Sequence, residues 1–373
     1  MSIVRLSVLK DAAYAPKVDG SLVMEPYDPD SRSGFLGTIP ADSFTGSDGS
    51  LGHYLRTLVA EQSRQLAPGM PVVLMVHGFL FDPRHATSPV PKESDNPHSR
   101  LYHFGDGDER DEQRHHTSSW PLRLGFADGD EGKRGLALAF GWHSQPGFAS
   151  SLISHFQNFY ARAYEYAGQT AWVFLNTLEI LAELLPQHPL HIFCHSLGSR
   201  VVVRALALAS KHRRSSVIER LGSVIVLGGA EYVVEAQLLE QRLKDLGPSS
   251  RPAFYNFVSR ENDVLDKLGE NFGPRTFGSS QVIGHNGLGS TTRADHWIDL
   301  QVDHKDLQEW MRVREIEISG DRPWNVWDHW YYYTFRGNMR LYERILRDPD
   351  SWRIEALREA GIPDGVRLDW RGD

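Results

Sequence analysis

Five short apolar runs are the feature that most restricts the fold of this chain. Each is rich in Val, Ile, Leu and Phe and is continuous rather than alternating, which is typical of strands buried on both faces of a parallel sheet. Stretches with apolar residues at three- and four-residue spacings precede or separate them and predict helices. We therefore expect a doubly wound α/β fold with a mostly parallel sheet. The strand candidates are 71–78, 135–142, 190–196, 223–229 and 253–259, and the helix candidates are 52–66, 151–185 and 200–212.

The remaining segments define the domain organisation. The N-terminal run "SIVRLSVL" alternates with period two and predicts an antiparallel edge strand. From 82 to 134 the chain is polar, rich in Pro, Asp, Arg and His, and without a sustained period, which indicates an insertion that is either a lid or a surface excursion. There is no internal repeat and no domain-sized linker, so we expect residues 1–373 to form a single domain.

Composition excludes several classes of function. A single cysteine, Cys194, excludes an intramolecular disulfide and a zinc or iron–sulfur site built from cysteines. A formal charge of −8 without a basic stripe argues against a nucleic-acid partner. No apolar run is long enough to span a bilayer, and the start "MSIVRLSVLKDAAYAP" lacks the layout of a secretory signal. We expect a cytoplasmic protein with a small-molecule partner, and the oligomeric state stays open.

The stretch "LHIFCHSLGSRVVVRALALAS" places Ser196 between a buried strand and a helix. So sharp a turn needs small neighbours, and Cys194 and Gly198 meet that need. The serine hydroxyl would stand above the carboxyl end of the sheet, where the N-terminus of the next helix presents free N–H groups and its positive dipole end. This arrangement suits an oxyanion. The alternative is that Ser196 is only the N-cap of the helix.

This pattern resembles the nucleophile elbow of the α/β-hydrolase superfamily, and the order of the strands extends the resemblance over most of the chain. The usual motif is Gly-x-Ser-x-Gly, whereas Cys194 occupies the first position here. The resemblance implies that Ser196 is the nucleophile. It also implies an oxyanion hole made by the backbone N–H groups of Leu197 and of Phe79, which follows the "HG" pair at the end of an earlier strand. It implies no cofactor and no metal.

A second segment narrows the resemblance. "FGWHSQPG", at 140–147, is similar to an aromatic-Trp-Ser segment in a little-characterised bacterial branch of the superfamily. Within it we expect Trp142 to belong to the core or to a pocket wall.

The segment "GDGDERDEQRHH", at 105–116, alternates carboxylates and ends on two histidines. It lacks the spacing of a calcium loop, and we interpret it as a solvated charge run.

The acid and the base follow from the chain order Ser, acid, His that members of this superfamily share. The resemblance implies that Asp263, in "AFYNFVSRENDVLDK", is the acid, and Asp266 and Glu261 are rivals. For the base it favours His329, in "RPWNVWDHWYYYTF", and His285, in "VIGHNGLGS", is the serious rival.

Three further histidines are weaker candidates. His296 and His304 also lie beyond Asp263 and complete the four candidates for the base, but they occur in "RADHWIDLQVDHKDL", which we interpret as a strand with a polar end that places both histidines on the surface. His195, beside the nucleophile, is expected to pack under the turn. The Trp and Tyr cluster at 324–333 would line an acyl or alcohol pocket or belong to the core.

We therefore expect a serine hydrolase that cleaves a carboxylic ester or a related acyl bond through Ser196, His329 and Asp263. An acyltransferase, a thioesterase or a cofactor-free perhydrolase could use the same triad with another acceptor or leaving group. The alternative outside enzymes is a hydrolase-like scaffold that binds a ligand or a partner without turnover.

Overall fold

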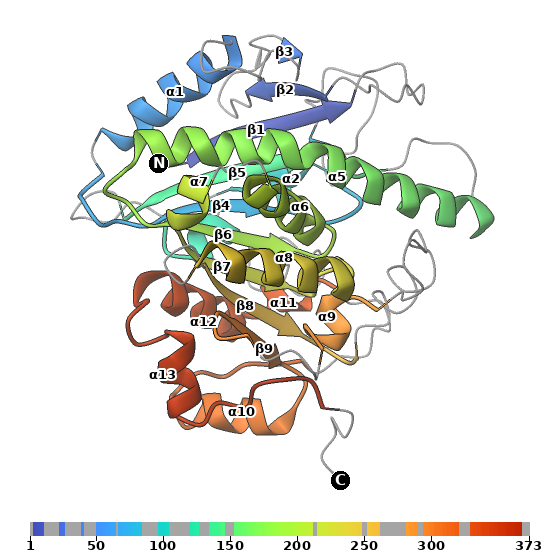
Figure 1. Ribbon diagram of the computed structural model, residues 1–373, viewed down its shortest axis with the longest axis vertical. Coiled ribbons are helices and arrows are strands. Elements are labelled where there is room, and N and C mark those ends of the chain that lie inside the picture. Colours follow the sequence, from blue (N-terminus) through green and yellow to red (C-terminus); the bar gives the residue numbers. More distant parts are fainter. Residues whose placement is uncertain are drawn as a thin grey trace.

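A computed structural model of the chain describes residues 3–10, 22–26, 39–40, 50–64, 66–83, 96–103, 119–126, 134–145, 153–211, 215–247, 252–261, 281–289, 294–320 and 329–367. These residues form a nine-stranded sheet in the order β3-β2-β1-β5-β4-β6-β7-β8-β9 (Figure 1). Its strands are β1 (Ile3–Lys10), β2 (Leu22–Pro26), β3 (Ile39–Pro40), β4 (Val72–Val76), β5 (Leu136–Trp142), β6 (Leu190–His195), β7 (Leu221–Leu227), β8 (Ala253–Val258) and β9 (Trp297–Gln301).

Seven neighbouring strands, from β1 to β9 in the sheet order, pair in parallel, and β2 and β3 add an antiparallel margin. The five continuous apolar runs are all confirmed as strands, β4 to β8. Every residue of β4, β5 and β6 is buried, as expected where both faces of a parallel sheet are covered. The carboxyl ends of these parallel strands lie along the same side of the sheet. Open α/β sheets bind their ligands at this side.

Helices cover both faces of the sheet (Figure 1). Alternate residues of β4 enter two separate cores, since Leu74 joins the first and Met75 joins the second. The helices of the first face include the three predicted ones; they are α1 (Ser50–Ser63), α5 (Ile153–Leu184), α6 (Gly198–Lys211), α7 (Ser215–Glu219), α8 (Val233–Leu246) and α9 (Ile283–Asn286). The second face carries α2 (Pro97–Arg100), α4 (Trp120–Arg123), α10 (Lys305–Arg312), α11 (Tyr331–Thr334), α12 (Arg336–Arg347) and α13 (Ile354–Glu359).

The N-terminal strand differs from its prediction. β1 lies inside the sheet, parallel to β5 and antiparallel to β2, so it is not an antiparallel edge strand. Its alternating polar side chains are satisfied by the segment 96–103: Arg5 Nε donates to the Tyr102 carbonyl at 3.0 Å, and the Ser7 hydroxyl lies 2.9 Å from His98 Nε2. Period two therefore reflects polar side chains with distant partners rather than contact with solvent.

Two described segments within 82–134 belong to the second core. The side chains of Tyr102, Trp120 and Phe126 are fully buried, and the Trp120 ring packs edge-on against Phe193 of β6 at 5.0 Å. These segments therefore complete the covering of the sheet. Most of the remaining range lies outside the described residues, as does the charge run at 105–116, and the lid stays a prediction.

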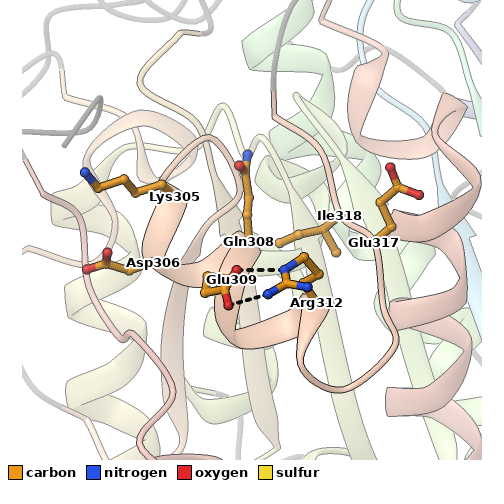
Figure 2. Close-up of a pocket in the computed structure, with 7 residues that line it drawn as sticks. All are labelled: Lys305, Asp306, Gln308, Glu309, Arg312, Glu317 and Ile318. Atoms are coloured by element: carbon orange, nitrogen blue, oxygen red, sulfur yellow. Dashed lines mark hydrogen bonds and ion pairs between the residues drawn. The ribbon is translucent and has the colours of Figure 1, made fainter.

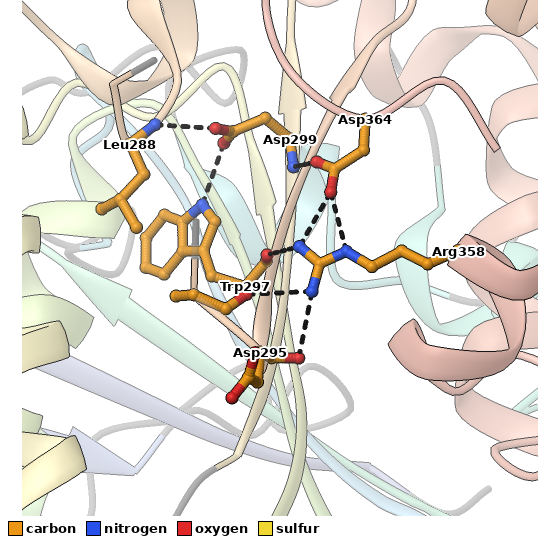
Figure 3. Close-up of polar contacts among 7 residues, drawn as sticks. Leu288, Asp295, Trp297, Asp299, Arg358 and Asp364 are labelled. Atoms are coloured by element: carbon orange, nitrogen blue, oxygen red, sulfur yellow. Dashed lines mark hydrogen bonds and ion pairs between the residues drawn. The ribbon is translucent and has the colours of Figure 1, made fainter. Parts of the chain in front are cut away.

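The last strand, β9, is held by a buried polar network (Figure 3). The Asp299 carboxylate accepts hydrogen bonds from Asn256 Nδ2 at 2.7 Å, Trp297 Nε1 at 2.9 Å and the Leu288 amide at 2.8 Å. The Asp299 amide donates to Asp364, whose carboxylate pairs with Arg358. The network ties α13 and the loop after α9 to the sheet.

None of the helices described here is long and apolar enough to cross a membrane.

Candidate active site

Ser196 occupies a sharp turn between β6 and α6. Its φ of 51° lies in the left-handed region, which costs a non-glycine residue on the order of 1–3 kcal/mol. The surrounding backbone holds it there: the Ser196 amide donates to the Leu227 carbonyl at 2.9 Å, and the Ser196 carbonyl accepts the Ala230 amide at 3.0 Å. Within the described part of the chain no group hydrogen-bonds to Ser196 Oγ, so this hydroxyl does not cap α6.

The turn depends on two glycines that leave no room for a side chain. A Cβ on Gly198 would lie 2.6 Å from the Val76 carbonyl oxygen, and one on Gly78 would lie 2.7 Å from Ser196 Cβ. The backbone that follows β4 therefore lies directly against the serine. Cys194, at the first position of the motif, is fully buried, and burial raises the pKa of its thiol. A buried thiol of this kind is a poor nucleophile.

The two predicted oxyanion donors lie on either side of this contact. Leu197 is fully buried, and its amide has no hydrogen-bond partner among the residues the structure describes. Phe79 follows Gly78, and its ring packs edge-on against Tyr160 of α5 at 5.5 Å. An oxyanion is stabilised by convergent backbone N–H groups, so the amides of Phe79 and Leu197 remain the predicted donors.

His329 is hydrogen-bonded to His195, the residue that precedes Ser196 in the turn. The His195 Nε2 atom lies 3.0 Å from the His329 carbonyl oxygen, and the two ring centroids are 4.5 Å apart. A carbonyl can only accept, so His195 Nε2 carries the proton. This bond joins residues 134 positions apart and places His329 beside the residue that precedes Ser196. His195 itself is buried under the turn, as expected.

Burial keeps both of these imidazoles neutral. Desolvation lowers the pKa of His329 well below its ordinary value, and the neighbouring His195 lowers it further. Desolvation also lowers the pKa of His195, to about 3. A neutral imidazole is the form that can accept a proton, but a buried imidazolium needs a carboxylate partner to be stabilised.

The other candidate histidines have different surroundings. His285 is buried in α9, and its carbonyl accepts a hydrogen bond from Arg260 at 3.3 Å. His304 caps α10 by accepting the Asp306 amide at 3.2 Å. The run at 293–307 contains strand β9, as expected, but the surface placement of His296 and His304 is wrong, since they are only 7% and 3% exposed.

The predicted acids lie mainly beyond the described part. Asp263 and Asp266 fall outside the described residues, and Glu261 is the last described residue of that loop. The Glu261 amide and that of its neighbour Arg260 both donate to the Asp303 carboxylate, at 3.1 and 2.8 Å. The start of the loop that carries Asp263 is therefore fixed at the end of β9.

A buried carboxylate beside the turn was not predicted. Glu231, fully buried after β7, accepts the Tyr164 hydroxyl at 2.6 Å and pairs with Arg200 of α6 at 2.9 Å. Its amide donates to Ser199 Oγ at 3.1 Å, and that hydroxyl donates to the Ser196 carbonyl at 2.7 Å. Burial raises the pKa of Glu231, while Arg200 opposes the shift. Glu231 therefore belongs to the support of the turn.

Glu231 does not replace the predicted acid. Its partners Tyr164 and Arg200 come from α5 and α6, on the first face of the sheet. His329, in contrast, precedes Tyr332 and Tyr333, which pack in the core of the second face. The only sequence signal for Glu231 was an acidic residue directly after a buried strand.

A pocket of about 580 Å³ lies beside α10 (Figure 2). It is lined by Lys305, Asp306, Gln308, Glu309, Arg312, Glu317 and Ile318, none of which is a predicted site residue. Two hydrogen bonds, at 2.8 and 2.7 Å, join Arg312 to Glu309 within it. The described residues contain no group of three or more His, Cys, Asp or Glu that could hold a metal ion.

The structure thus brings together the segments that carry four of the five predicted site residues. Ser196 and Leu197 form the turn, Phe79 follows the glycine packed against it, and His329 is bound through His195. Asp263 lies outside the described residues. No protein-family model matches the chain, and no curated protein matches it.

Proposed function

We propose that this protein is a serine hydrolase of the α/β-hydrolase type that cleaves a carboxylic ester through an acyl-enzyme. One relationship carries the proposal: a serine with a φ of 51° sits between a buried strand and a helix, and the residue before it is hydrogen-bonded to a histidine from far down the chain. Strain at a non-glycine residue is characteristic of functional turns. The proposed substrate is a small acyl compound, and no cofactor is needed.

The chain order supports the assignment of roles. Ser196 follows β6, in the middle of the sheet, and Asp263 follows β8, two strands further along the same parallel sheet. His329 comes after β9, the last strand. Serine, acid and histidine therefore follow strands whose carboxyl ends share one edge, as in the superfamily that the sequence resembles.

The reaction would proceed in two halves. His329 takes the proton of Ser196 Oγ as that oxygen forms a bond to the substrate carbonyl carbon, and the amides of Phe79 and Leu197 stabilise the oxyanion. The imidazolium then gives its proton to the leaving alkoxide as the C–O bond breaks. Water, deprotonated by His329, attacks the acyl carbon, and the bond from that carbon to Ser196 Oγ breaks as the imidazolium returns the proton to Oγ, which releases the acid and restores Ser196. Asp263 stabilises the imidazolium in both halves.

A fluorophosphonate probe followed by intact-mass analysis tests the nucleophile. We expect one adduct on the wild-type protein, no adduct on Ser196→Ala, and full labelling of Ser210→Ala, which removes a hydroxyl from the other end of α6. A folded wild-type protein that takes up no probe would instead indicate a binding scaffold. Labelling that persists in Ser196→Ala would assign the nucleophile elsewhere.

The acceptor and leaving group define the type of hydrolase. A panel of aryl esters and acyl thioesters, assayed with and without an added alcohol, separates an esterase from a thioesterase and an acyltransferase. We expect ester hydrolysis that does not require the alcohol. Turnover of thioesters alone, or transfer to the alcohol in place of hydrolysis, would favour the alternatives on the same triad.

A further inference from the structure

The loop that carries Phe79 is bound by the end of the neighbouring strand β5. Trp142 makes two hydrogen bonds to His77: its amide donates to His77 Nε2 at 2.9 Å, and its indole Nε1 donates to the His77 carbonyl at 2.9 Å. The two rings are also stacked, with centroids 5.7 Å apart and planes inclined by 6°. Both side chains are fully buried.

These bonds determine the tautomer of His77. Because Nε2 accepts from Trp142, the proton resides on Nδ1, which donates to the Gly78 carbonyl at 2.9 Å. Burial lowers the pKa of His77 to about 3, so the ring stays neutral in the working range of the enzyme and keeps this tautomer. The orientation of the Gly78 carbonyl thus depends in part on Trp142.

Ser144 supplies the second donor to the same carbonyl. Its hydroxyl donates to the Gly78 oxygen at 2.8 Å and accepts the Phe81 amide at 3.0 Å. The Ser144 amide donates to the Phe81 carbonyl at 2.9 Å. Between these anchors Leu80 adopts a left-handed φ of 73°. The loop from Gly78 to Phe81 is therefore held at both of its ends by one serine.

The carbonyl determines where the next amide points. In a planar trans peptide the C=O of one residue and the N–H of the next point in opposite directions, and no described peptide bond is cis. Two donors that fix the Gly78 carbonyl therefore also fix the Phe79 N–H. Gly78 lies against Ser196, so this N–H belongs to a peptide that adjoins the proposed nucleophile.

We propose that Ser144 is a positioning residue that orients the Phe79 amide as an oxyanion donor, and that Trp142 assists it through His77. The inference rests on the proposed function. Ser144 is only 1% exposed, so it acts through the Gly78–Phe79 peptide and not by touching the substrate. Loss of a whole oxyanion donor typically costs about 10²–10³ in rate, and a donor that is only misaligned should cost less.

Ser144→Ala is the direct test, in the full-length protein and with an ester substrate. We expect kcat to fall about 10- to 100-fold with little change in KM, because the oxyanion exists only in the transition state. Affinity for a trifluoromethyl ketone, which forms an oxyanion on Ser196, should fall by a similar factor. Ser144→Thr keeps the hydroxyl and should restore part of the activity. Ser223→Ala, which alters a buried serine near the amino end of β7, serves as the control.

Trp142→Phe provides a second variant that keeps a stacked ring and loses the indole donor to His77. We expect a smaller fall in kcat, again with KM retained. A wild-type enzyme that labels at Ser196, together with unchanged kcat and unchanged ketone affinity in both variants, would overturn the role of Ser144 alone. A wild-type protein that neither labels nor hydrolyses esters would overturn the proposed function itself.

Discussion

His195 donates a hydrogen bond of 3.0 Å to the carbonyl of His329, so the residue before the proposed nucleophile binds the residue proposed as the base. This contact links the elbow, formed by β6 and α6, to a segment that lies beyond β9. It also identifies which of the late histidines to test first.

Removal of the proposed base should abolish most turnover. We expect His329→Ala to lower kcat by several orders of magnitude, on the order of 10⁴-fold or more, because members of a triad act as a unit. His285→Ala, which removes the rival histidine, should leave kcat within a few-fold of wild type. Steady-state ester hydrolysis by both variants is the measurement, and the reverse pattern would make His285 the base.

The pH profile should reflect the burial of His329. Its pKa lies well below the ordinary value, so the neutral form that the proposed mechanism requires persists at mildly acidic pH. We expect kcat/KM to decrease only when the pH falls through the lowered pKa of His329, which lies below about 6.5. His195→Phe removes a neighbour that lowers this pKa, so the acidic limb should move to higher pH. A limb that moves to lower pH in this variant would contradict the arrangement.

Three substitutions test which carboxylate is the acid of the proposed triad. Asp263→Asn should lower kcat by about 10⁴-fold, because the amide can hold the imidazole in the wrong tautomer. Asp266→Asn and Glu261→Gln change the neighbouring carboxylates and should have little effect. Ester hydrolysis by the three variants at equal folded concentration decides among them, and a large loss in one of the two controls would move the role to that residue.

The buried Glu231 should make stability depend on pH. Its pKa is raised in the folded state, so protonation favours folding. Relative to Glu231→Gln, the wild-type free energy of unfolding should be highest below the ordinary carboxyl pKa of about 4.3 and should decline as pH rises through the raised value. Urea unfolding of both proteins between pH 4 and 8 measures this difference, and an increase with pH would contradict the raised pKa.

Loss of the carboxylate is a separate test of the same network. Glu231→Ala leaves Arg200 without its partner and should cost about 3–5 kcal/mol of stability, the usual range for a broken buried pair. Glu359→Ala, at an exposed position of α13, should change stability by less than about 0.5 kcal/mol. A small effect of the first substitution would mean that the turn does not depend on Glu231.

The sequence predicted the centre of the fold well because that part depends on local pattern. Strands β4 to β8 are covered on both faces, and each appears as a continuous apolar run. β1 was misassigned because Arg5 and Ser7 find their partners in residues 96–103, which lie far away in sequence. An alternating sequence shows that the two faces of a strand differ, but it does not show that one of these faces is exposed to solvent.

The site was predictable only in its backbone part. Ser196 and its small neighbour Gly198 are visible as a motif, because a tight strand-to-helix turn restricts residue size. The role of Glu231 and the hydrogen bond from His195 to His329 were not predicted, since they arise from contacts between distant segments. Burial of His304 had the same origin, because a polar residue after a strand gives no sign that other elements cover it.

The φ of 51° at Ser196 also means that the chain is less stable with serine there than it would be with glycine. A glycine at position 196 should raise the melting temperature while removing the proposed nucleophile, whereas alanine would retain the unfavourable dihedral. The substitution that raises thermal stability at this position would then be the one that removes turnover. Attempts to make this protein more heat-resistant should therefore keep serine at position 196.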